Sequence, residues 1–133
     1  MFKIRSISVL LLSLCMIYSF KSSIISNKDL AGIWVFSKQT ASYYEYTKSR
    51  SFKKDEPGFE FKTNGKFIIR QNSSWCGTPP IQFENYKGNW KFTSDSTIHI
   101  IHKYWGGTRE QELLIIGLNE TTLRLKITST NNH

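Results

Sequence analysis

The sequence predicts an all-β domain, an antiparallel barrel that follows an N-terminal export segment. Beyond residue 30, short runs alternate apolar and polar residues, which is typical of strands with one buried face. Turn-forming residues separate these runs, and no segment there has a convincing helical periodicity. About eight antiparallel strands in one small domain would leave costly unpaired edges, so we expect the sheet to close into a barrel.

The first 22 residues have the plan of a signal peptide. Lys3 and Arg5 precede an apolar run over residues 7–20, and a basic region before a short hydrophobic core is the mark of an export signal. The run is shorter than the roughly 20 apolar residues that span a bilayer. We therefore expect residues 1–22 to be removed and the protein to be secreted, periplasmic or associated with the cell envelope. Cys15 ends a stretch that resembles a bacterial lipobox, so a lipid anchor at this residue is the alternative.

The rest of the 133-residue chain has the size of one domain, which we place at residues 29–129. Cys76 is its single cysteine, so an intramolecular disulfide is excluded and the core must supply the stability. The formal charge of +8 is moderately basic. Because the chain carries an export signal, we expect no nucleic-acid partner, and we expect a monomer with a possible affinity for the envelope or a membrane surface.

The first half of the domain contains four expected strands. Residues 32–40 alternate Ile33 and Val35 with Trp34 and Phe36. The next three runs are rich in tyrosine, threonine or phenylalanine, and they cover residues 43–52, 59–62 and 67–71. Asn64-Gly65 predicts a tight hairpin between the last two runs, with both residues at positive φ.

An irregular segment, residues 72–80, separates these strands from the second half of the domain. Turns at Ser94-Asp95-Ser96, Gly106-Gly107 and Asn119-Glu120 divide the alternating runs that follow. The expected strands of this half cover residues 82–86, 88–93, 97–105, 110–118 and 121–128.

Several of these segments together resemble a known family. They are Asp29 to Trp34 with its Gly-x-Trp motif, the hairpin at 59–67, the second Gly-x-Trp at 88–90, and the last hairpin at 118–123. The chain thus resembles the small bacterial lipocalin-like domains, a family of uncharacterised exported proteins. The resemblance implies an up-and-down, eight-stranded barrel of the calycin type, in which Gly32, Trp34, Gly88 and Trp90 are structural signatures.

The lipocalin pattern also packs an arginine from a late strand on the first-strand tryptophan. Arg124 is the candidate by position, but its neighbours Leu123 and Leu125 form the apolar face of the expected strand. Because successive side chains of a strand point to opposite faces, we expect Arg124 to point outward.

The resemblance implies that the barrel binds one small hydrophobic ligand, because a barrel of this size has room for little more. We expect the site at the end opposite the Gly-x-Trp motif, where the segment 72–80 combines an aromatic residue, a thiol and two prolines. The candidate ligand-binding residues are Trp75, Cys76, Phe67, Phe83, His102 and Tyr104. The alternative is a barrel filled by its own aromatic residues, which serves as a structural or interaction module of the envelope. Such a module would use the tyrosine- and lysine-rich surface of residues 43–54, or the Trp75 segment, to meet its partner.

Catalytic and metal sites are not expected. His99 and His102 are three residues apart in a strand, so their side chains point to opposite faces and cannot share one ion. A thiol nucleophile at Cys76 would need a base beside it, and His102 is the only candidate. The sequence contains no phosphate-binding loop, zinc-protease helix or hydrolase elbow. We therefore expect a protein that is not an enzyme and has no cofactor.

Overall fold

The computed structural model describes residues 24–74, 77 and 79–133. The expected signal peptide, Cys15, Trp75 and Cys76 lie outside the described residues. In the part of the chain that is described, no helix is long and apolar enough to cross a membrane.

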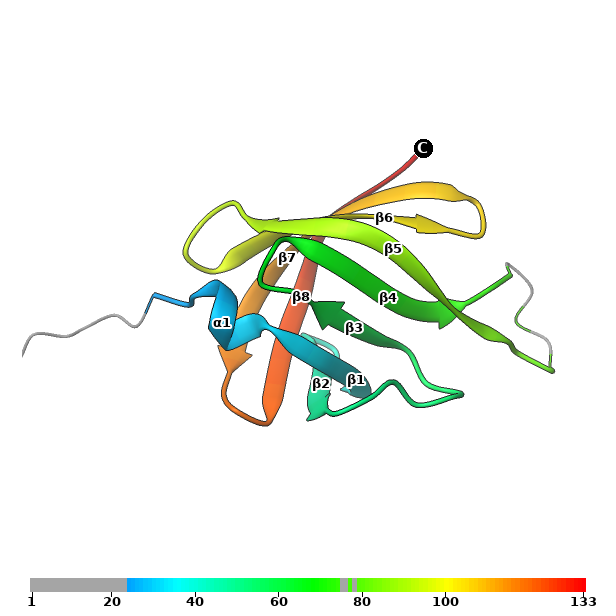
Figure 1. Cartoon of the computed structure of the whole chain (residues 1–133), viewed down its shortest axis with the longest axis horizontal. Helices are drawn as coiled ribbons and strands as arrows, with labels where there is room; N and C mark the ends of the chain where they lie inside the picture. The colour runs from blue at the N-terminus through cyan, green and yellow to red at the C-terminus, as the bar shows by residue number, and fades with distance from the viewer. Residues whose placement is uncertain (1–23, 75–76, 78) are drawn as a thin grey trace, which may run out of the picture.

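The protein is an all-β, closed, eight-stranded antiparallel barrel, as the sequence predicts (Figure 1). One helical turn, α1 (Asn27–Leu30), leads into the first strand. The strands are β1 (Gly32–Gln39), β2 (Tyr44–Ser49), β3 (Gly58–Phe61), β4 (Lys66–Asn72), β5 (Phe83–Phe92), β6 (Thr97–Tyr104), β7 (Gly107–Leu118) and β8 (Thr122–Asn132).

The order of the strands corrects the expected up-and-down topology. Around the barrel the order is β1-β2-β8-β7-β6-β5-β4-β3, so β1 lies between β2 and β3 and these two strands do not pair. Residues 50–57 must therefore cross from one side of β1 to the other. We call this segment the crossover.

The crossover runs along the outside of β1. The carbonyl oxygen of Pro57 accepts a hydrogen bond of 2.9 Å from the backbone N–H of Phe36. Phe52 lies against Gly58, where a Cβ would come within 3.1 Å of its ring. Val35 is opposite Gly58 in the ladder and is only 3% exposed, although its neighbour Trp34 belongs to the core. The outward-facing Val35 is thus covered by the crossover.

Arg70 of β4 fastens the crossover to the barrel. Its Nε donates to the carbonyl oxygen of Lys53 at 3.0 Å, and one terminal nitrogen donates to that of Lys54 at 2.7 Å. The other terminal nitrogen donates to the Asn85 side chain on β5 at 2.9 Å. One guanidinium therefore joins three segments of the chain.

Strand β5 is continuous where the sequence predicts two runs, at 82–86 and 88–93. It passes through Gly88, at which a Cβ would lie 2.0 Å from the carbonyl oxygen of Ile101 on β6. Glycine therefore permits the close approach of two strands here and does not end the strand.

The hairpin between β3 and β4 also differs in detail from the prediction. Gly65 has a φ of 86°, but Asn64 has a negative φ, since no non-glycine residue has a positive one in the described residues. The N–H of Gly65 donates to the carbonyl oxygen of Lys62 at 3.1 Å, and the N–H of Lys62 donates to that of Lys66 at 3.0 Å. This is the three-residue connection, in which only the glycine needs the left-handed conformation.

The interior of the barrel is packed with aromatic and aliphatic side chains. Neighbouring rings lie 4.6 to 5.9 Å apart at their centroids. The continuous series of rings is Phe36, Tyr46, Phe59, Phe61, Phe67, Trp90 and Phe92. These seven rings fill space that a ligand inside the barrel would need.

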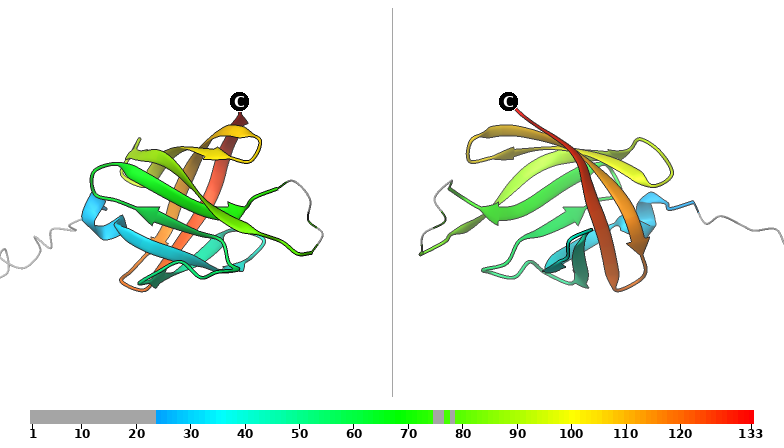
Figure 2. Two further views of the ribbon diagram at one scale, coloured as in Figure 1. Left: turned by 45° about the vertical axis from the view of Figure 1, so that its right-hand side comes forward. Right: turned by 180° about the vertical axis from the view of Figure 1, so that it is seen from behind.

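The two ends of the barrel differ. α1 lies at the end where β1 begins, together with the hairpins β3–β4, β5–β6 and β7–β8 (Figures 1 and 2). We call it the α1 end. The opposite end holds the β1–β2 and β6–β7 hairpins and the connection between β4 and β5. We call it the far end.

Candidate functional site

The first Gly-x-Trp motif builds the α1 end. Trp34 is 1% exposed and its indole Nε1 donates a hydrogen bond of 2.8 Å to the carbonyl oxygen of Leu30. Leu30, the last residue of α1, is fully buried. The indole therefore joins the only helical turn among the described residues to the first strand, which explains why this position carries a buried ring with a donor.

Lys48 of β2 covers the outer side of that ring. Its Nζ lies 4.5 Å from the centroid of Trp34 and donates to the carbonyl oxygen of Ala31. Gly32 has a φ of +122°, and a Cβ there would collide with the Lys48 side chain. The glycine of the motif thus leaves room for a cation over the tryptophan.

Arg124 does not lie over the ring of Trp34. It points outward, as expected, and its Nε lies 2.9 Å from the carboxylate of Glu45, while its guanidinium lies over Tyr43. The cation over the ring of Trp34 thus comes from β2 and not from β8.

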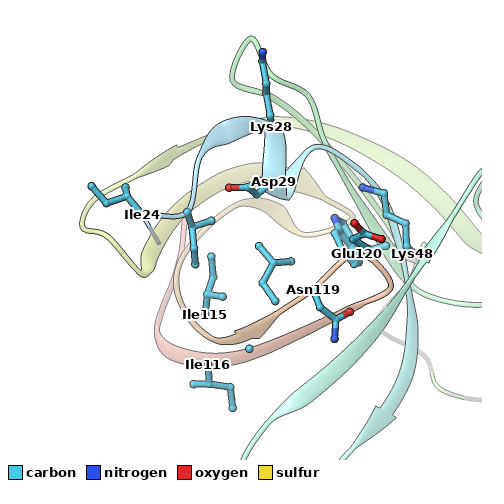
Figure 3. A pocket seen from close by; sticks show the side chains of 12 residues that line it. Ile24, Lys28, Asp29, Lys48, Ile115, Ile116, Asn119 and Glu120 are labelled. Carbon is cyan, nitrogen blue, oxygen red and sulfur yellow. The ribbon is translucent and has the colours of Figure 1, made fainter. Parts of the chain in front are cut away.

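A pocket of about 650 Å³ opens at the α1 end (Figure 3). It lies between the segment that contains α1 and the hairpin that joins β7 to β8, with Trp34 and Lys48 between them. The lining residues are Ile24, Ile25, Lys28, Asp29, Trp34, Lys48, Ile115, Ile116, Gly117, Leu118, Asn119 and Glu120. Its size is within the range of small-molecule sites, about 300 to 1,000 Å³.

Apolar side chains form the wall of the pocket that adjoins the core. Ile115 is 6% exposed and belongs to the core cluster, and Ile25 and Leu118 pack against that cluster. Two further isoleucines remain in contact with solvent, since Ile24 is 72% exposed and Ile116 is 46% exposed. These two isoleucines extend the apolar wall of the pocket to its rim.

Both signs of charge occur around this apolar wall. Lys28 and Lys48 are cationic, and Asp29 and Glu120 are anionic. The Asp29 carboxylate accepts hydrogen bonds from the backbone N–H of Ser26 at 2.8 Å and from its hydroxyl at 3.0 Å, which lowers the pKa of this carboxyl. The pocket can therefore hold an apolar body and meet either sign of charge on its polar part.

The four predicted ligand residues that the structure describes do not line this pocket, and Trp75 and Cys76 lie outside the described residues. Phe67 and His102 are buried side by side, with ring centroids 5.9 Å apart. Tyr104 lies farther along β6 toward the far end, where the Arg109 guanidinium covers its ring at 4.4 Å. Phe83 is opposite Asn72 in the ladder and is an odd number of residues from the inward-facing Trp90, so it points to the outer face.

His102 is a buried, neutral histidine. It is 2% exposed, and its Nδ1 lies 2.8 Å from the carbonyl oxygen of Lys103, which can only accept, so Nδ1 carries the proton. Burial lowers the pKa of this imidazole, and the nearby positive charge of Arg109 acts in the same direction. The ring shares the inner face of β6 with Ile98 and Ile100, which are also buried.

No group of three or more metal-ligating side chains gathers among the residues that the structure describes. His99 is opposite Lys91 and His102 is opposite Gly88 in the same ladder, so the two histidines face opposite sides as expected. The distance between Cys76 and His102 is not defined, because Cys76 lies outside the described residues.

Sequence reasoning missed the pocket at the α1 end. It lies between residues 24–29 and 115–120, which are far apart in the chain, and it adjoins the Gly-x-Trp motif, whereas we expect the site at the opposite end. One signal was present: the run Leu113-Leu114-Ile115-Ile116 breaks the alternation of β7, so at least one of its apolar side chains must face outward.

The chain matches no protein-family model, and no curated protein or solved structure is significantly similar to it.

Proposed function

We propose that this is an exported, lipocalin-like binding protein that holds a small amphiphilic molecule in the pocket at the α1 end. The observation that carries the proposal is the pocket of about 650 Å³ next to a barrel whose own interior is packed with aromatic rings. A ligand of the expected size finds room beside the Gly-x-Trp motif and not among the rings.

The lining supports an amphiphile. The isoleucines and Leu118 provide an apolar wall, which favours a hydrocarbon or ring system. The lysines and carboxylates around it would meet a polar or charged head group, which fixes the orientation of the ligand.

Native mass spectrometry of the purified protein, with organic extraction, tests whether a small molecule accompanies it. A direct test uses dodecanoate as the probe and isothermal titration calorimetry as the readout. We expect binding of one dodecanoate per protein. Absence of both a co-purified molecule and dodecanoate binding contradicts the proposal.

A pair of isoleucines gives the matched control. Ile116 lines the pocket and is 46% exposed, whereas Ile127 of β8 is 39% exposed and is not a lining residue. We expect Ile116→Asn to weaken dodecanoate binding about tenfold, the loss of roughly 1.4 kcal/mol of apolar contact. Ile127→Asn should leave it unchanged, and equal effects of the two variants would contradict the assignment.

An interaction module is the second candidate function, and one surface favours it. Trp105 at the tip of the β6–β7 hairpin is 48% exposed, with Tyr104 edge-on to it at 5.5 Å and Arg109 over Tyr104. Tryptophan, tyrosine and arginine are the residues that dominate protein interfaces. If this function holds, Trp105→Ser abolishes the capture of a specific envelope partner and leaves dodecanoate binding intact.

A further inference from the structure

One edge of β8 is unpaired over most of the strand. β2 pairs only with Thr122 to Leu125 of β8, whereas β7 pairs with β8 as far as Asn132. Beyond Leu125, no described strand lies along the other edge, and residues 126–132 are all exposed. Figure 2 shows this part of β8 at the margin of the sheet, ending at the C-terminus.

The hydrogen bonds at the end of the strand show which groups are free to pair. Thr108 and His133 exchange two backbone bonds, of 3.1 and 2.8 Å, so the N–H and C=O of His133 point to β7. The register between β7 and β8 is regular from Ser129 to Asn132. In an antiparallel ladder the backbone N–H and C=O of successive residues point alternately toward the partner strand and away from it. The backbone groups of Thr130 and Asn132 therefore point away from β7, into the unpaired edge.

This edge lacks the usual protection against pairing. Natural edge strands carry lysines, prolines or inward-pointing charges that prevent another strand from adding to them. Lys126 is the only charged residue between 126 and 132, and there is no proline in this stretch. Ile127, Thr128 and Thr130 are β-branched residues, which favour the extended conformation.

We propose that a second copy of this chain pairs with the unpaired edge of β8, which joins the two barrels through one continuous antiparallel sheet. An edge strand that meets its own copy about a two-fold axis is complementary to itself. With the axis at Thr130, the segment 128–132 pairs with the same segment of the second copy, and Thr130 exchanges two backbone bonds with its counterpart. Lys126 then lies outside the paired stretch, so the two copies place no like charges opposite each other.

The lack of charge along the unpaired edge of β8 favours a second copy of the chain as its partner. The chain is basic overall, so a second copy approaches most readily through a surface that carries little of that charge. The segment 128–132 is Thr, Ser, Thr, Asn and Asn, which meets that requirement. The sequence alone predicts a monomer, because it does not reveal that β8 extends past β2.

Sedimentation velocity at protein concentrations from about 5 to 500 µM tests the proposal. We expect a reversible monomer–dimer equilibrium in the native protein. Thr130→Pro removes the N–H that points into the edge and leaves the backbone bonds to β7 intact, so it should be monomeric throughout; like Thr130→Ala, it loses the side-chain bond from Gln111. Thr130→Ala keeps the N–H and should dimerise as the native protein does. Thr130→Lys tests the same edge by charge repulsion if the proline variant proves unfolded by circular dichroism.

Amide hydrogen exchange locates the interface. We expect the Thr130 and Asn132 amides to exchange at least tenfold more slowly at high than at low protein concentration. A monomer at every concentration overturns the proposal. So does a dimer that survives Thr130→Pro or Thr130→Lys, or one in which these two amides exchange equally fast. Protection by a co-purified peptide, visible as a mixed complex in native mass spectrometry, would also overturn it.

Discussion

The tryptophans of the two Gly-x-Trp motifs tie different segments of the barrel together. Trp34 joins α1 to β1 and supports Lys48 on its face. Trp90 donates from its indole Nε1 to the carbonyl oxygen of Lys62, 2.8 Å away, and thereby ties β5 to the β3–β4 hairpin. Each buried indole N–H donates to a backbone carbonyl of another segment. Both tryptophans therefore belong to the core and also connect two segments of the chain.

At Gly88, the addition of a single methyl group should destabilise the folded protein. In Gly88→Ala the added methyl group would lie against the carbonyl oxygen of Ile101 and the backbone of His102, neither of which can move alone. We expect a loss of about 3 kcal/mol in the free energy of unfolding, as for severe overpacking. Urea denaturation measures it. Gly77→Ala is the control, because a Cβ there meets nothing within 4 Å, and a Gly88→Ala protein as stable as this control would contradict the close approach.

His102 should make the protein less stable in mild acid. Its pKa in the folded protein lies below the usual 6.5, because burial disfavours the imidazolium. The unfolded chain therefore binds a proton more readily, and the free energy of unfolding falls as the pH drops from about 7 through about 6.5. In His102→Gln this decrease should be smaller, whereas His99→Gln should keep it. Thermal unfolding at several pH values between about 5 and 8 is the measurement, and a decrease that is unaltered in His102→Gln argues against this origin.

At the scale of elements, the crossover is the feature that makes this barrel differ from an up-and-down one. It places β1 between β2 and β3, and it is fastened by Arg70. Val35 gains its burial from this segment and not from the barrel interior. Any loosening of the crossover therefore exposes an apolar residue of the first strand.

Arg70→Met should loosen the crossover without unfolding the barrel. The substitution removes three hydrogen bonds of a charged donor, two of them to the crossover, and we expect a loss of about 2 kcal/mol in stability. Limited proteolysis with trypsin should then cleave after Lys53 or Lys54 sooner than in the native protein. Lys87→Met, an exposed residue on the neighbouring strand, is the control. Equal cleavage rates in all three proteins would refute the role of Arg70.

The strands were predictable from the sequence, but their arrangement was not. Alternation over 32–40 or 97–105 reflects one buried face and locates a strand. The residues of the crossover carry no such pattern, so the sequence does not show that β3 pairs with β1 and not with β2. The sequence predicts a new run at Gly88, because the role of this glycine, the close approach to Ile101, is visible only across two strands.

The candidate site was less predictable, because its parts come from distant segments. Residues 24–29 and 115–120 meet only after the barrel closes. Lys48 belongs to the site because it is opposite Trp34 in the β1–β2 ladder, and this register is not encoded in either strand alone. The aromatic content did predict a filled barrel as an alternative, and the packed rings agree with it.

On the scale of the whole molecule, the protein has a packed barrel, and the two binding surfaces that we propose lie at its ends. The α1 end carries the pocket, and the far end carries the exposed Trp105 hairpin and the unpaired edge of β8. The packed interior between them supports both ends and holds the neutral His102. In this account the ligand and a second copy of the chain bind at opposite ends, so they do not compete.

The central claim is that the ligand binds beside the Gly-x-Trp motif and not inside the barrel. A titration of the ¹⁵N-labelled protein with dodecanoate, followed by two-dimensional NMR, tests it most directly. We predict shifts of the Trp34 indole N–H and of the Lys28, Gly117 and Leu118 amides, while His102 and Tyr104 stay unchanged. Shifts confined to Phe67, His102 and Tyr104 would place the ligand inside the barrel and contradict the account.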